Sequence, residues 1–407
     1  MRKSNLPPAG GNLFQKIKAK CAEAEAKGIK LIKLSIGQPK GPALEPARIA
    51  AAEAIMSHQE SMHEYQDNGS PGVPDFALRF VQVHVKKSLP YLPDGSIDFL
   101  PIPGMKPMLG VVIDAMGGWC EYGHPYPAIV GTMTNPGYPT PVDQCRMRSS
   151  VVTHFHLPTE QKEGFLFDPT EVVETLSRGH GNKLLMLNFP HNPTGIVAEA
   201  DWLRELCGLC EKNNIHIFCD SAYAILSHSP YASTLTDVAV EFPELNWAEA
   251  FSASKAGNNT GWRIGAIVGS PEFVGDIKRI KGNTDSGFAA PLAAGILNLY
   301  RHHMIEITRV RLLYRHRLDL LTKIATAAGM RLAVQPEGGF FVLFDCPKKA
   351  FGQDIRSSDH FNDLMIENTG IVGVPFNPWI RYAVCAADIE DIMRDIRCGF
   401  DQASVSY

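Results

Sequence analysis

The chain has 407 residues, enough for two compact domains and a large buried core. Its hydrophobic fraction of 45% and charged fraction of 20% are those of a globular protein and exclude a disordered or fibrous one. The net charge of −4 argues against a nucleic acid as the main partner.

The N-terminal sequence contains no apolar run that could act as a signal peptide. Residues 122–142 form the longest stretch without Asp, Glu, Lys or Arg, but five prolines interrupt it, so no membrane-spanning helix is predicted there. We therefore expect a cytoplasmic protein that does not contact a membrane.

The centre of the chain alternates predicted strands and helices. A continuous apolar run at 184–189 precedes an amphipathic helix near 199–213 and a second apolar run at 215–219. Short runs of this kind are typical of parallel strands covered on both faces. The three elements predict a right-handed βαβ unit within an α/β fold.

The helix near 199–213 contains a C-x-x-C pair, Cys207 and Cys210. No second pair and no nearby histidine cluster completes a zinc site. Nine cysteines in a chain of this length do not form a dense disulfide framework either. We predict that the pair packs as two small core residues.

Two further strands are predicted at 248–251 and 262–269, on either side of the segment that contains Lys255. Beyond these strands the pattern predicts one long helical stretch over 290–325. A strand pair over 331–346 and a final helix over 388–400 follow.

The change of pattern near residue 290 indicates a domain boundary. We expect a large domain over 46–289. Residues 1–45 and 290–407 are expected to form a second, smaller domain. The sequence contains no internal repeat and no low-complexity segment.

Ligands of parallel α/β sheets bind beyond the carboxyl ends of the strands. Two polar motifs, HNPTG at 191–195 and DSAY at 220–223, follow strands that end at this edge. Taken separately, an Asp after a strand is more often a turn or cap residue, and Asn-Pro and Thr-Gly pairs are typical of loops. Their combination at neighbouring strand ends favours a binding site.

Lys255 follows a strand in a segment of small residues, S-A-S-K-A-G. Partial desolvation favours the neutral, nucleophilic form of an amine, so Lys255 is a candidate for a Schiff base with a carbonyl compound. Arg263 and the hydroxyl of Ser252 suit a phosphate group on the same compound. Pyridoxal 5'-phosphate carries both groups.

The pyridine nitrogen of this cofactor needs an anion, and Asp220 at the end of a strand is suitable. Tyr223 and Asn192 could donate to its phenolic oxygen. A competing interpretation is that Ser252 and Lys255 form the S-x-x-K nucleophile motif of penicillin-binding proteins and serine β-lactamases. The chain contains neither S-D-N nor K-T-G, which argues against that hydrolase.

Together with TGWRIG and the late WIRYAVC, these motifs resemble the class I and II aminotransferases of PLP fold type I over nearly the whole chain. The resemblance implies an α/β large domain with a mostly parallel seven-stranded sheet covered by helices, plus a smaller α+β domain. It implies that Lys255 binds the cofactor covalently and, once released, moves the proton between substrate Cα and cofactor C4'. It likewise implies Asp220 on the pyridine nitrogen, with Tyr223 and Asn192 on the phenolic oxygen.

The resemblance also implies a set of phosphate contacts from two parts of the chain. They are Ser252, Ser254, Arg263, Gly104, Met105 and Lys106. The last three open a helix, and the N–H groups of a helix N-terminus favour an anion. Met105 and the Pro107 that follows are bulkier than the residues usual at this turn.

Four more positions are implied. Tyr138 stacks on the pyridine ring, and Arg381 clamps the substrate α-carboxylate, near Gly37 and Asn192. Tyr65 reaches the phosphate of the neighbouring subunit, which implies a homodimer with two shared active sites.

The implied reaction moves an amino group from an L-amino acid to a 2-oxo acid such as 2-oxoglutarate by a ping-pong cycle. Dicarboxylate-specific members carry an extra arginine where residues 282–291 read GNTDSGFAAP, which contains none. This segment is similar to that of members acting on LL-diaminopimelate, alanine or related amino acids, and aspartate stays a further candidate.

Two alternatives share these motifs. A fold-type-I lyase, such as a carbon–sulfur β-lyase, differs only in what leaves after the proton is removed. A non-catalytic PLP-binding regulatory module would need a fused DNA-binding segment, and the sequence shows none.

Overall fold

The computed structural model describes residues 13–117 and 126–407, which form two compact units. The larger unit comprises Gln38–Arg315 and Gln335–Phe340, and the smaller one comprises the described part of Met1–Gly37, His316–Val334 and Phe341–Tyr407. Both boundaries that the sequence indicated, at 45/46 and 289/290, lie inside the larger unit. The reason is that α10 (Ala290–His302) packs tightly against α2 (Glu45–Ile55), where a Cβ on Gly295 would lie 2.8 Å from Ala51 Cβ.

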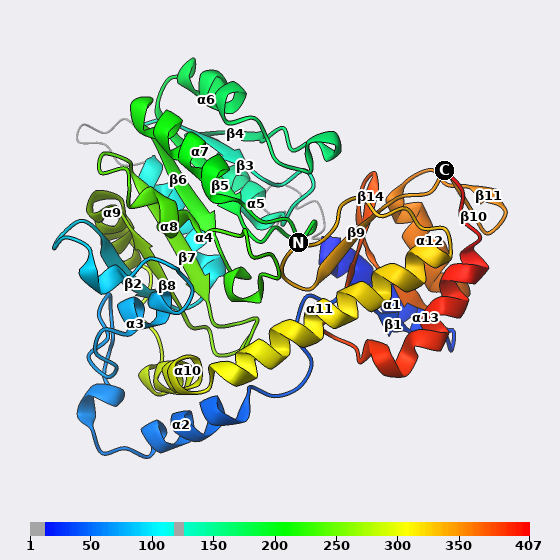
Figure 1. The fold of residues 1–407 in the computed structure, drawn as a ribbon, viewed down its shortest axis with the longest axis horizontal. Helices are drawn as coiled ribbons and strands as arrows, with labels where there is room; N and C mark the ends of the chain where they lie inside the picture. Colours follow the sequence, from blue (N-terminus) through cyan, green and yellow to red (C-terminus); the bar gives the residue numbers. More distant parts are fainter. Residues whose placement is uncertain (1–12, 118–125) are drawn as a thin grey trace, which may run out of the picture. The chain divides into compact units, whose positions relative to one another are not determined.

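The larger unit is built on a seven-stranded sheet (Figure 1). In spatial order its strands are β2 (Asp98–Ile102), β8 (Gly265–Gly269), β7 (Trp247–Ser252), β6 (Ile215–Asp220), β5 (Asn182–Asn188), β3 (Ala128–Thr132) and β4 (Val152–His156). β8 runs opposite to the other six strands of this sheet, which all point the same way, so the predicted mostly parallel sheet is confirmed. Apolar runs make these strands because helices cover both faces and exclude water from them.

Helices lie on both faces of this sheet (Figure 1). Beside α2 and α10 they are α3 (Phe76–Gln82), α4 (Met105–Met116), α5 (Thr140–Met147), α6 (Pro169–Ser177), α7 (Ala200–Lys212), α8 (Leu235–Ala239), α9 (Pro271–Lys281) and the start of α11 (Met304–Ala327). One face is covered by α4 and α9, whose Met108 and Phe273 pack with Phe218 and Ala250 of the sheet. Short 3-10 turns occur at Glu60–Met62, Leu89–Tyr91, Gln161–Glu163 and Ala224–Leu226.

The prediction of one long helix over 290–325 is wrong. The helix ends at His302, and His303, with φ −131° and ψ 34°, separates α10 from α11. Helical periodicity continues through the break, because the side chains on both sides of it are buried, so the sequence pattern does not reveal the change of direction.

The smaller unit combines a three-stranded antiparallel sheet with helices. The sheet has the order β13 (Val374–Phe376), β14 (Trp379–Ala383) and β9 (Phe341–Asp345), and the helices are α1 (Leu13–Ala26), α12 (Ser358–Thr369), α13 (Ile389–Ala403) and the rest of α11. Two short ladders add β1 (Ile32–Lys33) with β12 (Ile371–Val372), and β10 (Lys349–Ala350) with β11 (Gln353–Asp354). The predicted strand pair over 331–346 forms in part, since Leu332 makes only an isolated bridge to Phe344 of β9.

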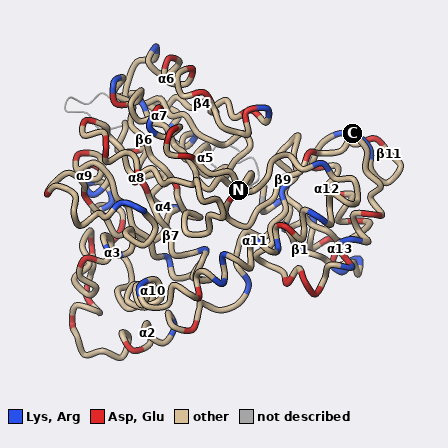
Figure 2. The backbone as a smooth tube through the Cα atoms, in the orientation of Figure 1, with Lys and Arg blue, Asp and Glu red and all other residues tan. Residues whose placement is uncertain are grey.

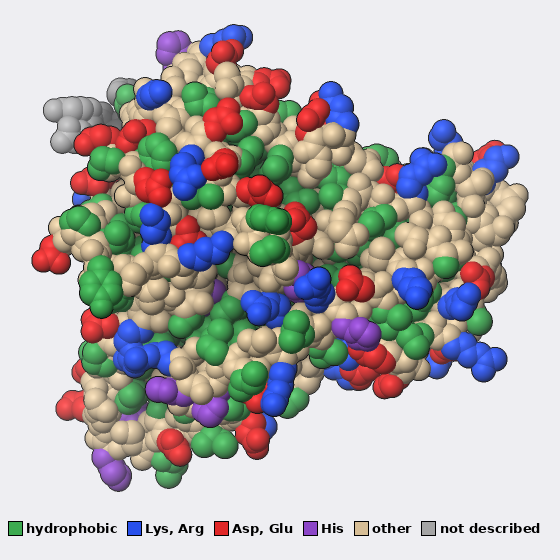
Figure 3. Space-filling view, in the orientation of Figure 1, with side chains coloured by type: hydrophobic (Ala, Val, Ile, Leu, Met, Phe, Trp, Pro, Cys, Tyr) green, Lys and Arg blue, Asp and Glu red, His purple; other side chains and the backbone are tan. Residues whose placement is uncertain are grey.

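Cys207 and Cys210 are fully buried in α7, and burial raises the pKa of both thiols. Their predicted role as core residues is confirmed. Among the described residues, no helix has the length and apolar character needed to cross a membrane. Charged positions are spread over helices and loops of both units (Figure 2), and acidic and basic side chains are interspersed on the face drawn in Figure 3.

Candidate active site

Three neighbouring parallel strands end in polar residues. Asn188 ends β5, Asp220 ends β6 and Ser252 ends β7, and Asn188 is paired in register with Asp220. Because carboxyl ends of parallel strands meet at one edge, the motifs that the sequence singled out share that edge.

Asp220 lies at the edge of a small cavity that Tyr138, Leu109 and Asn188 also line. Its Oδ1 accepts a hydrogen bond of 3.2 Å from the backbone N–H of Ala222. Burial raises the pKa of Asp220 to about 6, although this hydrogen bond and the positive charge of Lys255 both act to lower it. Asp220 and Tyr138 thus line the same cavity.

Lys255 follows β7 by three residues and is half-buried. Its Nζ lies 5.8 Å from the ring centroid of Tyr223. Tyr223 is 7% exposed, and its ring is held at its edge by Phe340, with the centroids 5.4 Å apart. Lys255 therefore lies near Tyr223, and its positive charge also acts on Asp220, so the three residues that the sequence selected lie in one region.

Gly104 and Arg263 meet at the N-terminus of α4. A Cβ built on Gly104 would lie 2.6 Å from Cζ of Arg263, so only glycine leaves room for the guanidinium there. The φ of Gly104, +82°, independently favours glycine. Met105 and Lys106 follow as the first two residues of α4, with Met105 buried and Lys106 exposed.

The N-terminus of α4, with Arg263 beside it, has the groups of an anion-binding site. The first N–H groups of a helix have no intrahelical acceptor and carry partial positive charge, and here a guanidinium lies beside them. Ser252 and Ser254 are both buried, and the N–H of Ser254 donates to Ser252 Oγ at 3.2 Å. The Arg263 guanidinium, the N–H groups at the start of α4 and the two serines are hydrogen-bond donors that suit a phosphate group.

Asn188 is a site residue that the sequence analysis missed. Its Oδ1 accepts from the N–H of Asn192 at 2.9 Å, and its Nδ2 donates to the backbone oxygen of Asp220 at 2.7 Å. One amide thus fixes the HNPTG motif to the end of β6. The signal was present, since Asn188 is a polar residue within an apolar run at its carboxyl end.

Within the smaller unit, Arg381 of β14 is only 1% exposed. Its Nη2 donates to the backbone oxygen of Ser35 at 2.8 Å, and its Cζ lies 4.2 Å from the ring centroid of Phe341. A Cβ on Gly37 would lie 3.0 Å from the same ring, so Gly37 and Arg381 share Phe341 as a neighbour. A guanidinium buried this far is held by the aromatic face and the carbonyl.

Tyr65 differs from the other candidate residues because it is 78% exposed. In the described part of the chain it makes no hydrogen bond or ring contact with any of them. The segment after it is fixed by a buried lysine: Nζ of Lys281, 0% exposed, donates to the backbone oxygen of Asp67 at 3.1 Å and pairs with Asp285 at 2.6 Å.

The sequence matches the family model "Aminotransferase class I and II" over residues 29–395. An LL-diaminopimelate aminotransferase of Dehalococcoides mccartyi is 27% identical over 383 residues, which cover 92% of this chain and 89% of that protein. One of Methanocaldococcus jannaschii is 29% identical over 380 residues, covering 91% of this chain and 85% of that protein.

Among solved structures, the aspartate aminotransferase double mutant of Thermus thermophilus has the same fold, with a TM-score of 0.79 at 20% identity and 99% coverage of both chains. The PLP fold type I architecture expected from the motifs is therefore confirmed. Because the family model spans most of the chain, this protein belongs to the class I and II aminotransferases and is an enzyme.

Proposed function

We propose that this enzyme binds pyridoxal 5'-phosphate at the edge formed by β5, β6 and β7 and transfers an amino group from an L-amino acid to a 2-oxo acid. The observation that carries the proposal is the convergence of Lys255, Tyr223 and Asp220 at that edge. The guanidinium of Arg263 beside Gly104, at the N-terminus of α4, supports it, since both present hydrogen-bond donors to a phosphate.

Each end of the cofactor has its own set of residues in this proposal. Asp220, as a carboxylate, would bond the protonated pyridine nitrogen, and that positive charge would lower the pKa of Asp220 from the value of about 6 to which burial raises it. Tyr223 and Asn192 donate to the phenolic oxygen, while Tyr138 packs on the ring. The phosphate is held by Ser252, Ser254, Arg263 and the N–H groups of Met105 and Lys106 after Gly104.

When bound, pyridoxal 5'-phosphate supplies an electron-accepting ring that stabilises negative charge at the substrate Cα. Lys255 would hold the cofactor through its amine, and the same amine would serve as the base that moves the proton at the substrate Cα. Arg381, with Gly37 beside Phe341, binds the substrate α-carboxylate through its guanidinium fork.

We propose LL-diaminopimelate as the first donor to test, because the relatives reported above carry that name. Residues 282–291 contain no arginine, so a second carboxylate of an aspartate donor has no partner from that segment. A homodimer in which Tyr65 completes the partner's phosphate site, and a cytoplasmic location, complete the proposal.

The test is a two-stage assay on the PLP-loaded protein. LL-diaminopimelate alone is expected to transfer no more than one amino group per subunit, and glutamate is expected only after 2-oxoglutarate is added. Arg381→Ala should raise the KM for the donor about tenfold or more, the typical loss of a hydrogen bond to a charged group, without releasing the cofactor. Continuous release of ammonia and pyruvate from a sulfur amino acid, with no 2-oxo acid present, would instead identify a lyase.

A further inference from the structure

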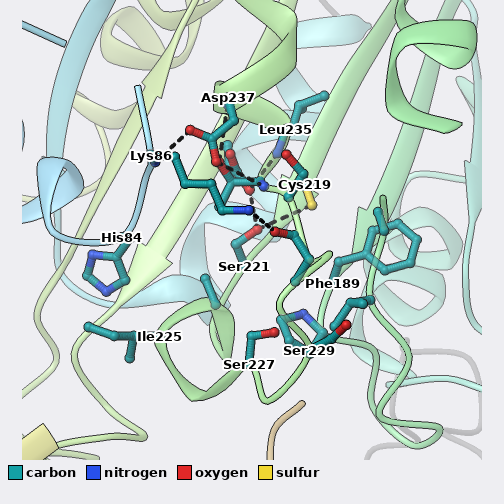
Figure 4. Close-up of a pocket in the computed structure, with 18 of the residues that line it drawn as sticks. His84, Lys86, Phe189, Cys219, Ser221, Ile225, Ser227, Ser229, Leu235 and Asp237 are labelled. Atoms are coloured by element: carbon teal, nitrogen blue, oxygen red, sulfur yellow. Dashed lines mark hydrogen bonds between the residues drawn. The ribbon is translucent and has the colours of Figure 1, made fainter. Parts of the chain in front are cut away.

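We propose that the larger unit holds a second small-molecule site, specific for an oxyanion such as a carboxylate or a phosphate, on the sheet face opposite the candidate active site. This site goes beyond the proposed aminotransferase function and does not depend on it. It occupies a cavity of about 250 Å³ (Figure 4).

The cavity lies behind the strand end that carries Asp220. Side chains of a strand alternate between its two faces. Phe218 and Asp220 border the cavity beside Tyr138, whereas Cys219 and Ser221 border the second cavity. Two separate spaces therefore lie on opposite faces of one strand.

The acidic side chains of the second cavity already have donors from the chain itself. Glu249 is fully buried and accepts from Leu235 N at 3.2 Å, from Thr236 N at 2.7 Å, from Thr236 Oγ1 at 2.6 Å and from Ser221 Oγ. Its two oxygens thus receive four hydrogen bonds, the number that a carboxylate accommodates.

Asp237 is satisfied in the same way. It accepts from the backbone N–H groups of Lys86 and Lys87, at 2.6 and 2.9 Å, and from the hydroxyl of Thr234 at 2.8 Å. A cationic ligand would find both carboxylates engaged, which argues against a cation in this cavity.

The basic side chains of the cavity are not neutralised. Arg311, on α11, lines the cavity and makes no hydrogen bond or ion pair with any residue of 13–117 or 126–407. The ammonium of Lys86 has a carbonyl partner, Ala232 O at 2.7 Å, but no carboxylate in the same described ranges. The donors without a carboxylate partner are thus those of Arg311 and Lys86, and an oxyanion would supply acceptors for them.

Two buried polar atoms in the wall support an occupied site. Ser227 Oγ and His84 Nε2 have no hydrogen-bond partner within the described part of the chain. Such atoms in a native protein call for water or a ligand. His84 adds no charge, because burial lowers the pKa of the ring to about 4 although the hydrogen bond to Phe80 O acts to raise it. Nδ1 donates that bond, so Nε2 of the neutral ring is an acceptor for water or for a hydroxyl of the ligand.

The volume limits the ligand. Pockets for drug-sized molecules typically measure about 300–1,000 Å³, so 250 Å³ suits a smaller molecule. Inorganic phosphate and citrate are suitable probes, since each presents oxygens that an arginine fork can bind.

The test is calorimetric titration of the PLP-loaded protein with phosphate and, separately, with citrate. We expect one of the two to bind in one equivalent per subunit. Arg311→Met should weaken binding about tenfold or more, and Lys86→Met should weaken it too, because each removes a charged donor. The matched control is Arg309→Met on the same helix, whose side chain pairs with Glu306 at 2.6 Å and does not line the cavity; it should bind as the wild type does.

Three outcomes would overturn the proposal. The first is that neither probe binds, and the second is that both cavity variants bind as tightly as the Arg309→Met control. The third is binding that survives in Arg311→Met but is lost in Arg381→Ala, because it would assign the probe to the candidate active site.

Discussion

Asp220 is buried at a position that disfavours its negative charge unless a cation lies beside it. Burial raises its pKa to about 6, and the Ala222 N–H and Lys255 offset only part of that effect. The negative charge that Asp220 needs in order to bond a protonated ring nitrogen therefore destabilises the folded state of the cofactor-free protein.

We predict that Asp220→Asn stabilises the cofactor-free protein above pH 6. The folded-state pKa exceeds the unfolded one, so the wild type loses stability as pH rises from about 4 to 6, when the buried group must ionise. Urea unfolding at pH 8 should show a variant that is more stable by about 1–3 kcal/mol, and the difference should vanish near pH 4. A difference in the free energy of unfolding that stays constant from pH 4 to pH 8 would show that ionisation of Asp220 is not its cause.

At the scale of elements, the sequence predicted best the strands and helices that show clear periodicity and the motifs that follow the strand ends. The strands that became β5, β6 and β7 and the helix α7 were found because their apolar runs are buried on both faces or on one stripe. The polar motifs after these strands could then be assigned to one edge. The break at His303 could not, since it depends on the surfaces that α10 and α11 pack against.

Contacts between segments far apart in the sequence were also beyond prediction. Arg263 lies against Gly104, and Phe341 lies between Gly37 and Arg381. Such pairs are fixed by the folded topology, and a single sequence shows only the residue types. Asn188 could have been found from its position at the end of an apolar run.

The buried ion pair of α9 gives a prediction for two loops. Nζ of Lys281 bonds Asp285 at 2.6 Å and the backbone oxygen of Asp67 at 3.1 Å, which joins the segment after Tyr65 to the N-T-D-S-G segment. Lys281→Met should cost about 3–5 kcal/mol, the usual effect of removing one partner of a buried pair. Hydrogen exchange should rise in residues 66–68 and 283–287 together.

Lys278→Met is the matched control. Lys278 lies in the same helix, but it is 29% exposed where it pairs with Asp98, so a smaller loss of stability is expected. Equal losses in the two variants, or faster exchange in only one of the two loops, would contradict a tether through Lys281.

For the whole molecule, we predict active sites that are shared between two subunits. If Tyr65 acts in the partner's site, Lys255→Ala and Tyr65→Ala subunits should complement each other, because a mixed dimer contains one site with both residues intact. Coexpressed, differently tagged subunits purified as hybrids should regain activity that neither parent dimer has. If Tyr65 acts in its own subunit instead, each site of the hybrid lacks either Lys255 or Tyr65. The hybrid would then show only the residual activity of the Tyr65→Ala subunit.

The most direct test of the central claim is the identity of the lysine that binds the cofactor. The protein is incubated with pyridoxal 5'-phosphate, reduced with borohydride and digested, and the modified peptide is sequenced by mass spectrometry. We predict one pyridoxyl group per subunit, on Lys255, and none on that peptide in Lys255→Ala. Labelling of a different lysine at one equivalent, or no stable label in the wild type, would contradict the site described here.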